Sequence, residues 1–111
     1  MTAPRADLKP AITPWQPEQD RHRLATLGKL AEEASELSAR AARCIIHGLD
    51  ERDPDTGLLN RDELAREIAD VTACLEIVRE TLSIVASDQR ITSKANGFRL
   101  WHSMIEGGGN G

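Results

Sequence analysis

Apolar residues recur at steps of three and four along three stretches of this chain, which is the spacing of one face of an α-helix. The first stretch runs from about Glu18 to Gly48, and the glycine is a natural helix stop. The second opens at Asn60, with Glu63 as its capping partner, and Ser87 caps the third. No two segments form a candidate strand pair, so the sequence predicts an all-α fold. The three apolar stripes, in chain order, are Leu24, Leu27, Ala31, Ala34, Leu37, Ala41 and Ile45; Leu64, Ile68, Val71, Leu75, Val78 and Leu82; and Ile91, Ala95, Phe98 and Ile105. We expect the side chains of the third stripe to face inward.

Prolines and glycines divide the sequence into three segments. Four prolines within residues 1–17 favour an extended N-terminal arm, because proline disrupts a helix interior. Residues 18–106 then form one helical domain, and the Gly-rich end predicts a flexible tail over residues 107–111. A single loop between the first two helices favours antiparallel packing. We therefore predict an antiparallel helical bundle with three main helices per chain, completed by oligomerisation, since 111 residues supply only a modest core.

Composition limits the partners and the compartment. A net charge of −4 argues against binding to a nucleic acid polymer, although a divalent metal would still allow a nucleotide to bind. The chain begins without the apolar run of a signal peptide, and no apolar stretch is long enough to cross a membrane. Cys44 and Cys74 do not form a metal-type Cys-x-x-Cys pair. We expect reduced thiols in a cytoplasmic protein, with a disulfide between helices as the alternative.

Two pairs of acidic residues stand out within the first two helical stretches. Glu33 and Glu36 are three residues apart, and so are Glu67 and Asp70, which places each pair about one helical turn apart. On a helical wheel, both pairs lie on the same side of their apolar stripes, so antiparallel packing turns all four carboxylates toward one groove. Hard oxygen ligands suit Mg²⁺, with Mn²⁺ as an alternative. The competing interpretation is that these acids are ordinary charges on a solvated helix face.

The polar loop between these helices contains "DPDTG", which resembles the start of an EF-hand calcium loop. Its glycine comes one residue too early, and no glutamate stands at the twelfth position counted from Asp53. We therefore reject an EF-hand. A carboxylate-bridged di-iron bundle is also disfavoured, because no Glu-x-x-His pair is present.

The segments "EEASE" and "EIAD" resemble the E-E-x-x-E … E-x-x-D signature of MazG-like all-α nucleoside triphosphate pyrophosphatases, a superfamily that includes dCTP pyrophosphatases and dimeric dUTPases. The resemblance covers roughly residues 20–100, and the segment between the acid blocks, residues 37–66, is long for the family. It implies that Glu33, Glu36, Glu67 and Asp70 bind Mg²⁺. It also implies assembly into dimers or tetramers, with Glu32 or Glu36 as the catalytic carboxylate that activates water.

Further residues would bind substrate if the resemblance holds. "NGFR" supplies Asn96 and Arg99 for the phosphates, whereas Thr92 occupies the position where relatives often have a lysine. Lys94 is the nearest lysine but lies on another face of the helix. Trp15 is a candidate for stacking on the base, with anchoring of the arm or of a subunit contact as the alternative.

The expected activity is Mg²⁺-dependent hydrolysis of a (d)NTP to the (d)NMP and pyrophosphate, in the housecleaning of nucleotide pools. The alternative is a non-catalytic helical module that binds nucleotides or proteins.

Overall fold

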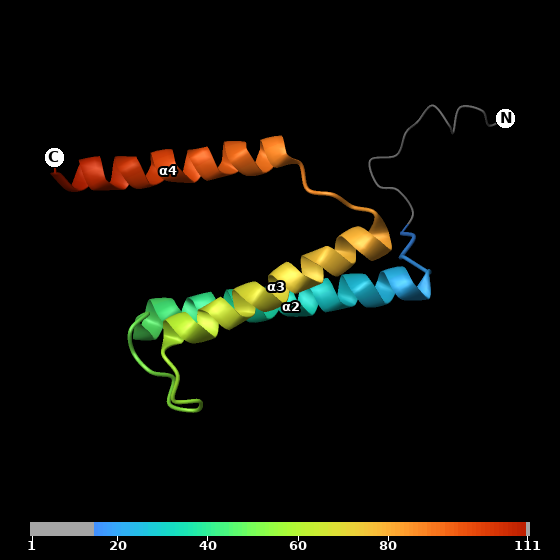
Figure 1. Ribbon diagram of the computed structural model, residues 1–111, viewed down its shortest axis with the longest axis horizontal. Coiled ribbons are helices and arrows are strands. Elements are labelled where there is room, and N and C mark those ends of the chain that lie inside the picture. Colours follow the sequence, from blue (N-terminus) through green and yellow to red (C-terminus); the bar gives the residue numbers. More distant parts are fainter. Residues whose placement is uncertain (1–14, 111) are drawn as a thin grey trace.

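The computed structural model describes residues 15–110, and side chains as far as Gly107. It contains three helices, α2 (Arg21–His47), α3 (Asn60–Leu82) and α4 (Asp88–Asn110), as Figure 1 shows. No strand occurs among the described residues, where the only β-type pairing is an isolated bridge between Arg52 and Leu59. The all-α class is therefore confirmed. The expected extended arm lies mostly outside the described residues, and residues 15–20 carry no helix.

The ends of α2 follow from local chemistry. The Asp20 side chain accepts a hydrogen bond from the backbone N–H of Arg23 at 2.9 Å, so the helix begins three residues later than the predicted Glu18. Gly48 ends the helix with a φ of 94°, and its N–H donates to the carbonyl of Cys44 at 2.9 Å. The predicted stop at Gly48 is thus confirmed.

The start of α3 differs from the prediction. Asn60 is already helical, and its amide Nδ2 donates to the carbonyl of Gly48 at 2.9 Å instead of capping its own helix. Glu63 accepts hydrogen bonds from Arg40 and Arg66 rather than reaching back to Asn60. The predicted capping pair is wrong because the Asn60 side chain bonds to the residue that ends α2, and the Glu63 side chain bonds to Arg40 within α2.

Helix α4 begins where the sequence predicted, since the Ser87 hydroxyl accepts a hydrogen bond from the N–H of Arg90 at 3.1 Å. Its other end differs, because the helix continues to Asn110 through the glycines expected to form a flexible tail. Glycine lowers helix propensity by about 1 kcal/mol relative to alanine but keeps the backbone N–H that a helix needs. The glycine run alone was therefore too weak a stop signal.

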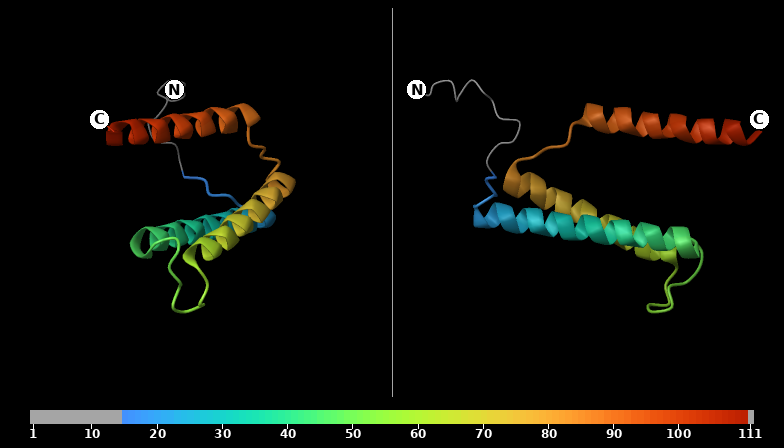
Figure 2. Two further views of the ribbon diagram at one scale, coloured as in Figure 1. Left: turned by 60° about the vertical axis from the view of Figure 1, so that its left-hand side comes forward. Right: turned by 180° about the vertical axis from the view of Figure 1, so that it is seen from behind.

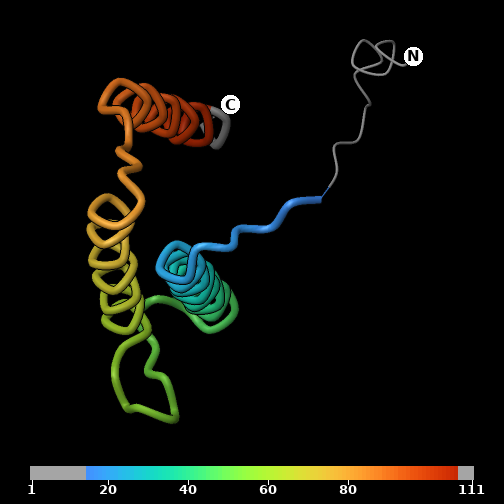
Figure 3. The backbone as a smooth tube through the Cα atoms, turned by 90° about the vertical axis from the view of Figure 1, so that its right-hand side faces the viewer, coloured from blue at the N-terminus to red at the C-terminus, as the bar shows by residue number. Residues whose placement is uncertain are grey.

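Helices α2 and α3 pack antiparallel as a hairpin, and α4 packs against neither of them within the described residues. Figure 2 shows the hairpin from two further sides, and Figure 3 shows α4 standing away from it. The segment between α3 and α4 follows Ser83, which ends α3 in the left-handed region with a φ of 57°. None of the described helices combines the length and the apolar character needed to span a membrane.

The core of a single chain is small. Cys74 and Val78 are the buried apolar residues of the described part, and both cysteines are free thiols. Ile91, Phe98 and Ile105 of the third stripe are each at least half exposed, so the expectation that they face inward is wrong for one chain alone. Among the described residues, no helix packs against this stripe, because α4 lies apart from the hairpin. The antiparallel pair is observed, whereas the described residues of one copy do not form a closed bundle.

Candidate metal centre

The structure brings together carboxylates from both helices of the hairpin. One oxygen each from Glu33 on α2 and from Glu67 and Asp70 on α3 lies within 4.8 Å of the other two. The three-residue spacing on α3 puts Glu67 and Asp70 on one face, and the antiparallel crossing of α2 brings Glu33 opposite them. Three of the four side chains named as metal ligands therefore form one cluster.

This cluster is poor in internal partners. Glu33 and Glu67 are half-buried, whereas Asp70 is exposed. The Oε2 atoms of both glutamates are buried and accept no hydrogen bond from the described residues. None of the three carboxylates forms an ion pair with a described lysine or arginine. Buried acceptors without donors are costly, so this arrangement favours a bound cation, a proton or a donating water molecule.

The electrostatics of Glu33 point the same way. Burial raises the pKa of its carboxyl above the ordinary value of 4.5, and the neighbouring charges of Glu36, Asp70 and Glu32 raise it further. Lys29 acts in the opposite direction but is the weakest of these influences. Like charges crowded in this way disfavour ionisation unless a cation compensates them. The donor set consists of carboxylate oxygens alone, which could hold a hard cation.

Glu36 lies at the edge of the cluster rather than inside it. It is exposed, and it lines a small pocket of about 210 Å³ with Glu67, Ala39, Arg40 and Arg43. It forms no ion pair with any described side chain. Its carboxylate is thus close to the cluster and unengaged.

Glu32, the other carboxylate named as catalytic, pairs with Lys29 instead. The Lys29 Nζ donates to Glu32 Oε1 at 3.1 Å, and both side chains are more than half exposed. The hydrogen bond to Glu32 is the main reason that the pKa of Lys29 is raised. An exposed pair of this kind contributes little stability.

An open groove of about 410 Å³ continues from the acids along the hairpin. Glu33 and Asp70 line one part of it, and the remaining walls are small or apolar apart from Thr26 and Lys29. Sequence reasoning missed these wall residues, although their spacing was informative, because they lie one and two turns from the acids on each helix. The wall residues are Ala25, Thr26, Lys29, Ala73, Cys74 and Ile77.

The residues expected to bind substrate are not brought to this groove within one chain. Asn96 and Arg99 lie on α4, where the Nη1 of Arg99 donates to Asn96 Oδ1 at 2.8 Å. The Nζ of Lys94 stands 5.4 Å from the centre of the Phe98 ring. Trp15 precedes α2 and is 87% exposed. All of these residues except Trp15 therefore depend on the placement of α4, which stands apart from the hairpin.

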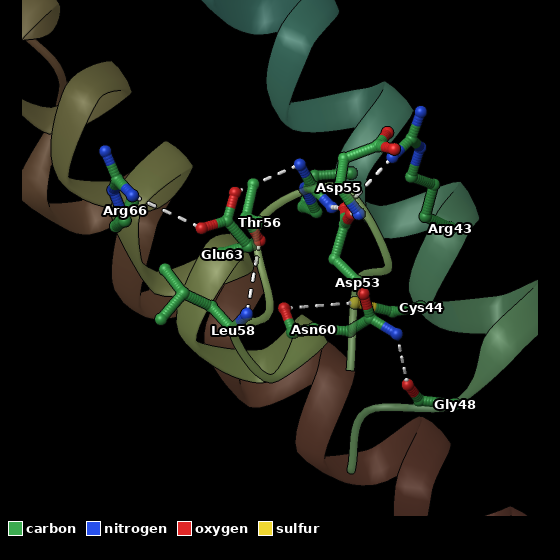
Figure 4. A network of polar contacts seen from close by, with 11 residues as sticks. Arg43, Cys44, Gly48, Asp53, Asp55, Thr56, Leu58, Asn60, Glu63 and Arg66 are labelled. Carbon is green, nitrogen blue, oxygen red and sulfur yellow. Dashed lines mark hydrogen bonds and ion pairs between the residues drawn. The ribbon is translucent and has the colours of Figure 1, made fainter. Parts of the chain in front are cut away.

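A second polar cluster, missed at the sequence level, joins the loop to both helices (Figure 4). Asp53 is 2% exposed, and its Oδ2 accepts hydrogen bonds from Arg40 at 2.7 Å and Arg43 at 3.0 Å. Arg40 also donates to Glu63 at 3.1 Å. The hydrogen bond from Arg40, followed by the one from the backbone N–H of Asp55, lowers the pKa of Asp53 to about 2. We refer to Arg40, Arg43, Asp53 and Glu63 as the loop network.

Comparisons with models of protein families, with curated proteins and with solved structures found no match for this chain.

Proposed function

We propose that this protein is a divalent-cation-dependent nucleoside triphosphate pyrophosphohydrolase, converting a (d)NTP to the (d)NMP and pyrophosphate. The observation that carries the proposal is the cluster of Glu33, Glu67 and Asp70, whose oxygens approach within 4.8 Å of one another. Two of these carboxylates bury an oxygen without a hydrogen-bond partner among the described residues. The resemblance of "EEASE" and "EIAD" to the pyrophosphatase signature supplies the reaction class.

Glu33, Glu67 and Asp70 would hold Mg²⁺, since they offer only carboxylate oxygens. When bound, the ion supplies positive charge to the phosphate oxygens and stabilises the charge that develops at the α-phosphorus. The hairpin fixes these acids on two packed helices, so little reorganisation is needed when a triphosphate arrives.

Glu36 is the better candidate for the carboxylate that accepts the proton of the attacking water. Glu32 is engaged by Lys29 at 3.1 Å, whereas Glu36 forms no ion pair with a described side chain and lies beside Glu67. A general base must be unengaged and within reach of the water that it activates. Water would attack the α-phosphorus, the bond to the bridging oxygen would break, and pyrophosphate would leave.

The groove beside the acids would take the nucleoside. Its volume of about 410 Å³ and its small, apolar walls suit a planar base. Its position next to Glu33 and Asp70 would leave the phosphates directed toward the carboxylates.

We further propose that a homodimer or homotetramer completes the site. Large apolar side chains are exposed on α4 and on the hairpin, an unfavourable state for a single copy in water. Packing of α4 against a hairpin would cover these faces. It would also carry Asn96 and Arg99 toward the phosphates, where a guanidinium gives strong, charge-assisted hydrogen bonds.

A panel of canonical and modified nucleoside triphosphates tests the proposal, with Mg²⁺ present and pyrophosphate as the measured product. We expect release from at least one nucleotide by the wild-type protein. Glu67→Gln removes one ligand charge and should abolish release while helicity by circular dichroism stays unchanged. Glu76→Gln, an exposed change on the same helix outside the cluster, is the matched control and should retain activity.

Full activity of Glu67→Gln would refute the assignment of the cluster. Absence of release by the wild-type protein from every nucleotide would favour the second candidate, a non-catalytic helical module that binds nucleotides or proteins. The exposed apolar faces of α4 and the hairpin are the observation in favour of that module.

A further inference from the structure

Arg40 and Arg43 lie next to the carboxylates of Glu36 and Glu67 without forming ion pairs with them. Arg40 follows Glu36 by four residues on α2, which is a favourable spacing and order for a helical ion pair. Arg40 and Arg43 also share the small pocket with Glu36 and Glu67. Neither of these glutamates forms an ion pair with an arginine anywhere in residues 15–107. Other acidic side chains therefore hold the guanidinium groups of Arg40 and Arg43 away from Glu36 and Glu67.

The loop supplies the competing acid. Asp53 Oδ2 accepts from Arg40 Nη1 at 2.7 Å and from Arg43 Nη1 at 3.0 Å. Glu63, one turn before Glu67 on α3, accepts from Arg40 Nη2 at 3.1 Å. Arg40 and Arg43 thus share two acids, of which Glu63 also pairs with Arg66 at 3.3 Å, and Asp53 is the only described ion-pair partner of Arg43.

Asp53 is itself fixed by the loop. Its backbone N–H donates to the carbonyl of Leu58 at 2.8 Å, and its carbonyl accepts from the N–H of Gly57 at 2.8 Å. Its second carboxylate oxygen accepts from the N–H of Asp55 at 2.8 Å. Gly57 has a φ of 78°, a backbone conformation that glycine adopts without strain. The loop thus fixes the carboxylate so that it faces Arg40 and Arg43 on α2.

We propose that Asp53 is a positioning residue that keeps Arg40 and Arg43 off Glu36 and Glu67, so that the carboxylates remain available to a divalent cation. The proposal rests on the cation site of the proposed function. Without the charge of Asp53, one of the two arginines has no acidic counterpart in the network. That arginine is Arg43, which lines a second pocket with Glu51 and Asp55 and shares the small pocket with Glu36 and Glu67. A guanidinium placed there would compete directly with the cation.

Titration of the full-length protein with Mn²⁺ alone, followed by isothermal calorimetry, tests this role. We expect Asp53→Asn to weaken Mn²⁺ binding by about tenfold. Asp55→Asn is the matched control, because it removes the same charge from an exposed position two residues away in the same loop. It should change the affinity by less than about twofold if the effect is local rather than long-range.

A double variant separates positioning from simple support of the fold. The double variant Asp53→Asn, Arg43→Gln still lacks the Asp53 carboxylate that ties the loop to α2. Its unfolding temperature should therefore stay below that of the wild type. Its Mn²⁺ affinity should nevertheless return toward that of the wild type, because the released arginine has been neutralised. A double variant that binds as weakly as Asp53→Asn alone would overturn the proposal.

A second pair of variants serves if circular dichroism shows Asp53→Asn to be unfolded. Glu63→Gln frees one guanidinium nitrogen of Arg40 and should weaken Mn²⁺ binding more than Asp62→Asn, its exposed neighbour on α3. Equal binding by the wild type and by a folded Asp53→Asn or Glu63→Gln variant would overturn the positioning role and leave the cation site standing. No Mn²⁺ binding by the wild type would overturn the cation site and this role together.

Discussion

Replacing Arg40 by methionine should destabilise the hairpin more than any other single change on its polar face. Arg40 lies on α2, Asp53 in the loop and Glu63 on α3, so one guanidinium joins three segments. Its side chain is 14% exposed, and those of Asp53 and Glu63 are 2% and 9% exposed. Methionine keeps much of the aliphatic stem while removing the charge, and it leaves two acids without this partner.

The magnitude follows from burial. Removing one partner of a buried ion pair typically costs about 3 to 5 kcal/mol, because the remaining charge is left desolvated. The slight exposure of Arg40 favours the lower end, about 3 kcal/mol, since solvent screens part of the loss. In a domain of this size, each kcal/mol shifts the unfolding temperature by roughly 4 to 8 °C. We therefore expect Arg40→Met to lower the unfolding temperature by at least about 12 °C.

Arg43→Met is the matched control, because Arg43 contacts the same Asp53 oxygen but is 51% exposed. Its loss should cost less than about 1 kcal/mol, as is usual for exposed pairs. Thermal unfolding followed at 222 nm, at one fixed protein concentration, compares the two variants with the wild type. If Arg40→Met lowers the unfolding temperature no more than Arg43→Met does, the loop network does not hold the hairpin together.

Three further predictions concern pH, metal and assembly. The hydrogen bonds from Arg40 and from the backbone N–H of Asp55 lower the pKa of Asp53 from 3.8 to about 2, so the stability from these contacts is fully present above 3.8 and is lost as pH falls to about 2. An acid titration by circular dichroism should show that loss in the wild type and not in Asp53→Asn; identical acid profiles would contradict it. The raised pKa of Glu33 means that its ionisation destabilises the metal-free fold as pH rises past the ordinary carboxyl value. Mg²⁺ should therefore raise the unfolding temperature more at about pH 7.5 than at about pH 4, and an equal shift at both would argue against this cluster as the site. Phe98→Asp puts a charge on the exposed apolar face of α4 and should shift sedimentation velocity toward smaller species, whereas an unchanged distribution would exclude that face from the contact.

The helices themselves could be predicted from the sequence because their signals are local. The apolar periodicity gave three helices, and Gly48 and Ser87 were identified correctly as a stop and a cap. Asn60 and Glu63 fitted a capping motif equally well, yet both are used in contacts with residues at least 12 positions away. A local sequence pattern does not show that partners elsewhere in the fold compete for the same side chain. The placement of α4 could not be predicted from its stripe, since an apolar face does not say which surface covers it.

The acidic cluster could also be predicted, because residue spacing within each helix is a local signal. Spacing of three residues and an antiparallel loop connection sufficed to bring Glu33, Glu67 and Asp70 together. Glu36 falls at the edge of the cluster, and an ideal helical wheel could not predict this because it omits the crossing angle of two packed helices. The loop network could not be predicted from local spacing, because Asp53 pairs with residues 10 and 13 positions away. Its actual partners, Arg40 and Arg43, lie on the preceding helix.

The most direct test of the account is a crystal structure of the protein grown with Mn²⁺, with data collected at the manganese absorption edge. The account predicts an anomalous difference peak at direct ligand distance from the carboxylates of Glu33, Glu67 and Asp70. A peak elsewhere, or a fully ordered cluster without one at saturating Mn²⁺, would contradict it.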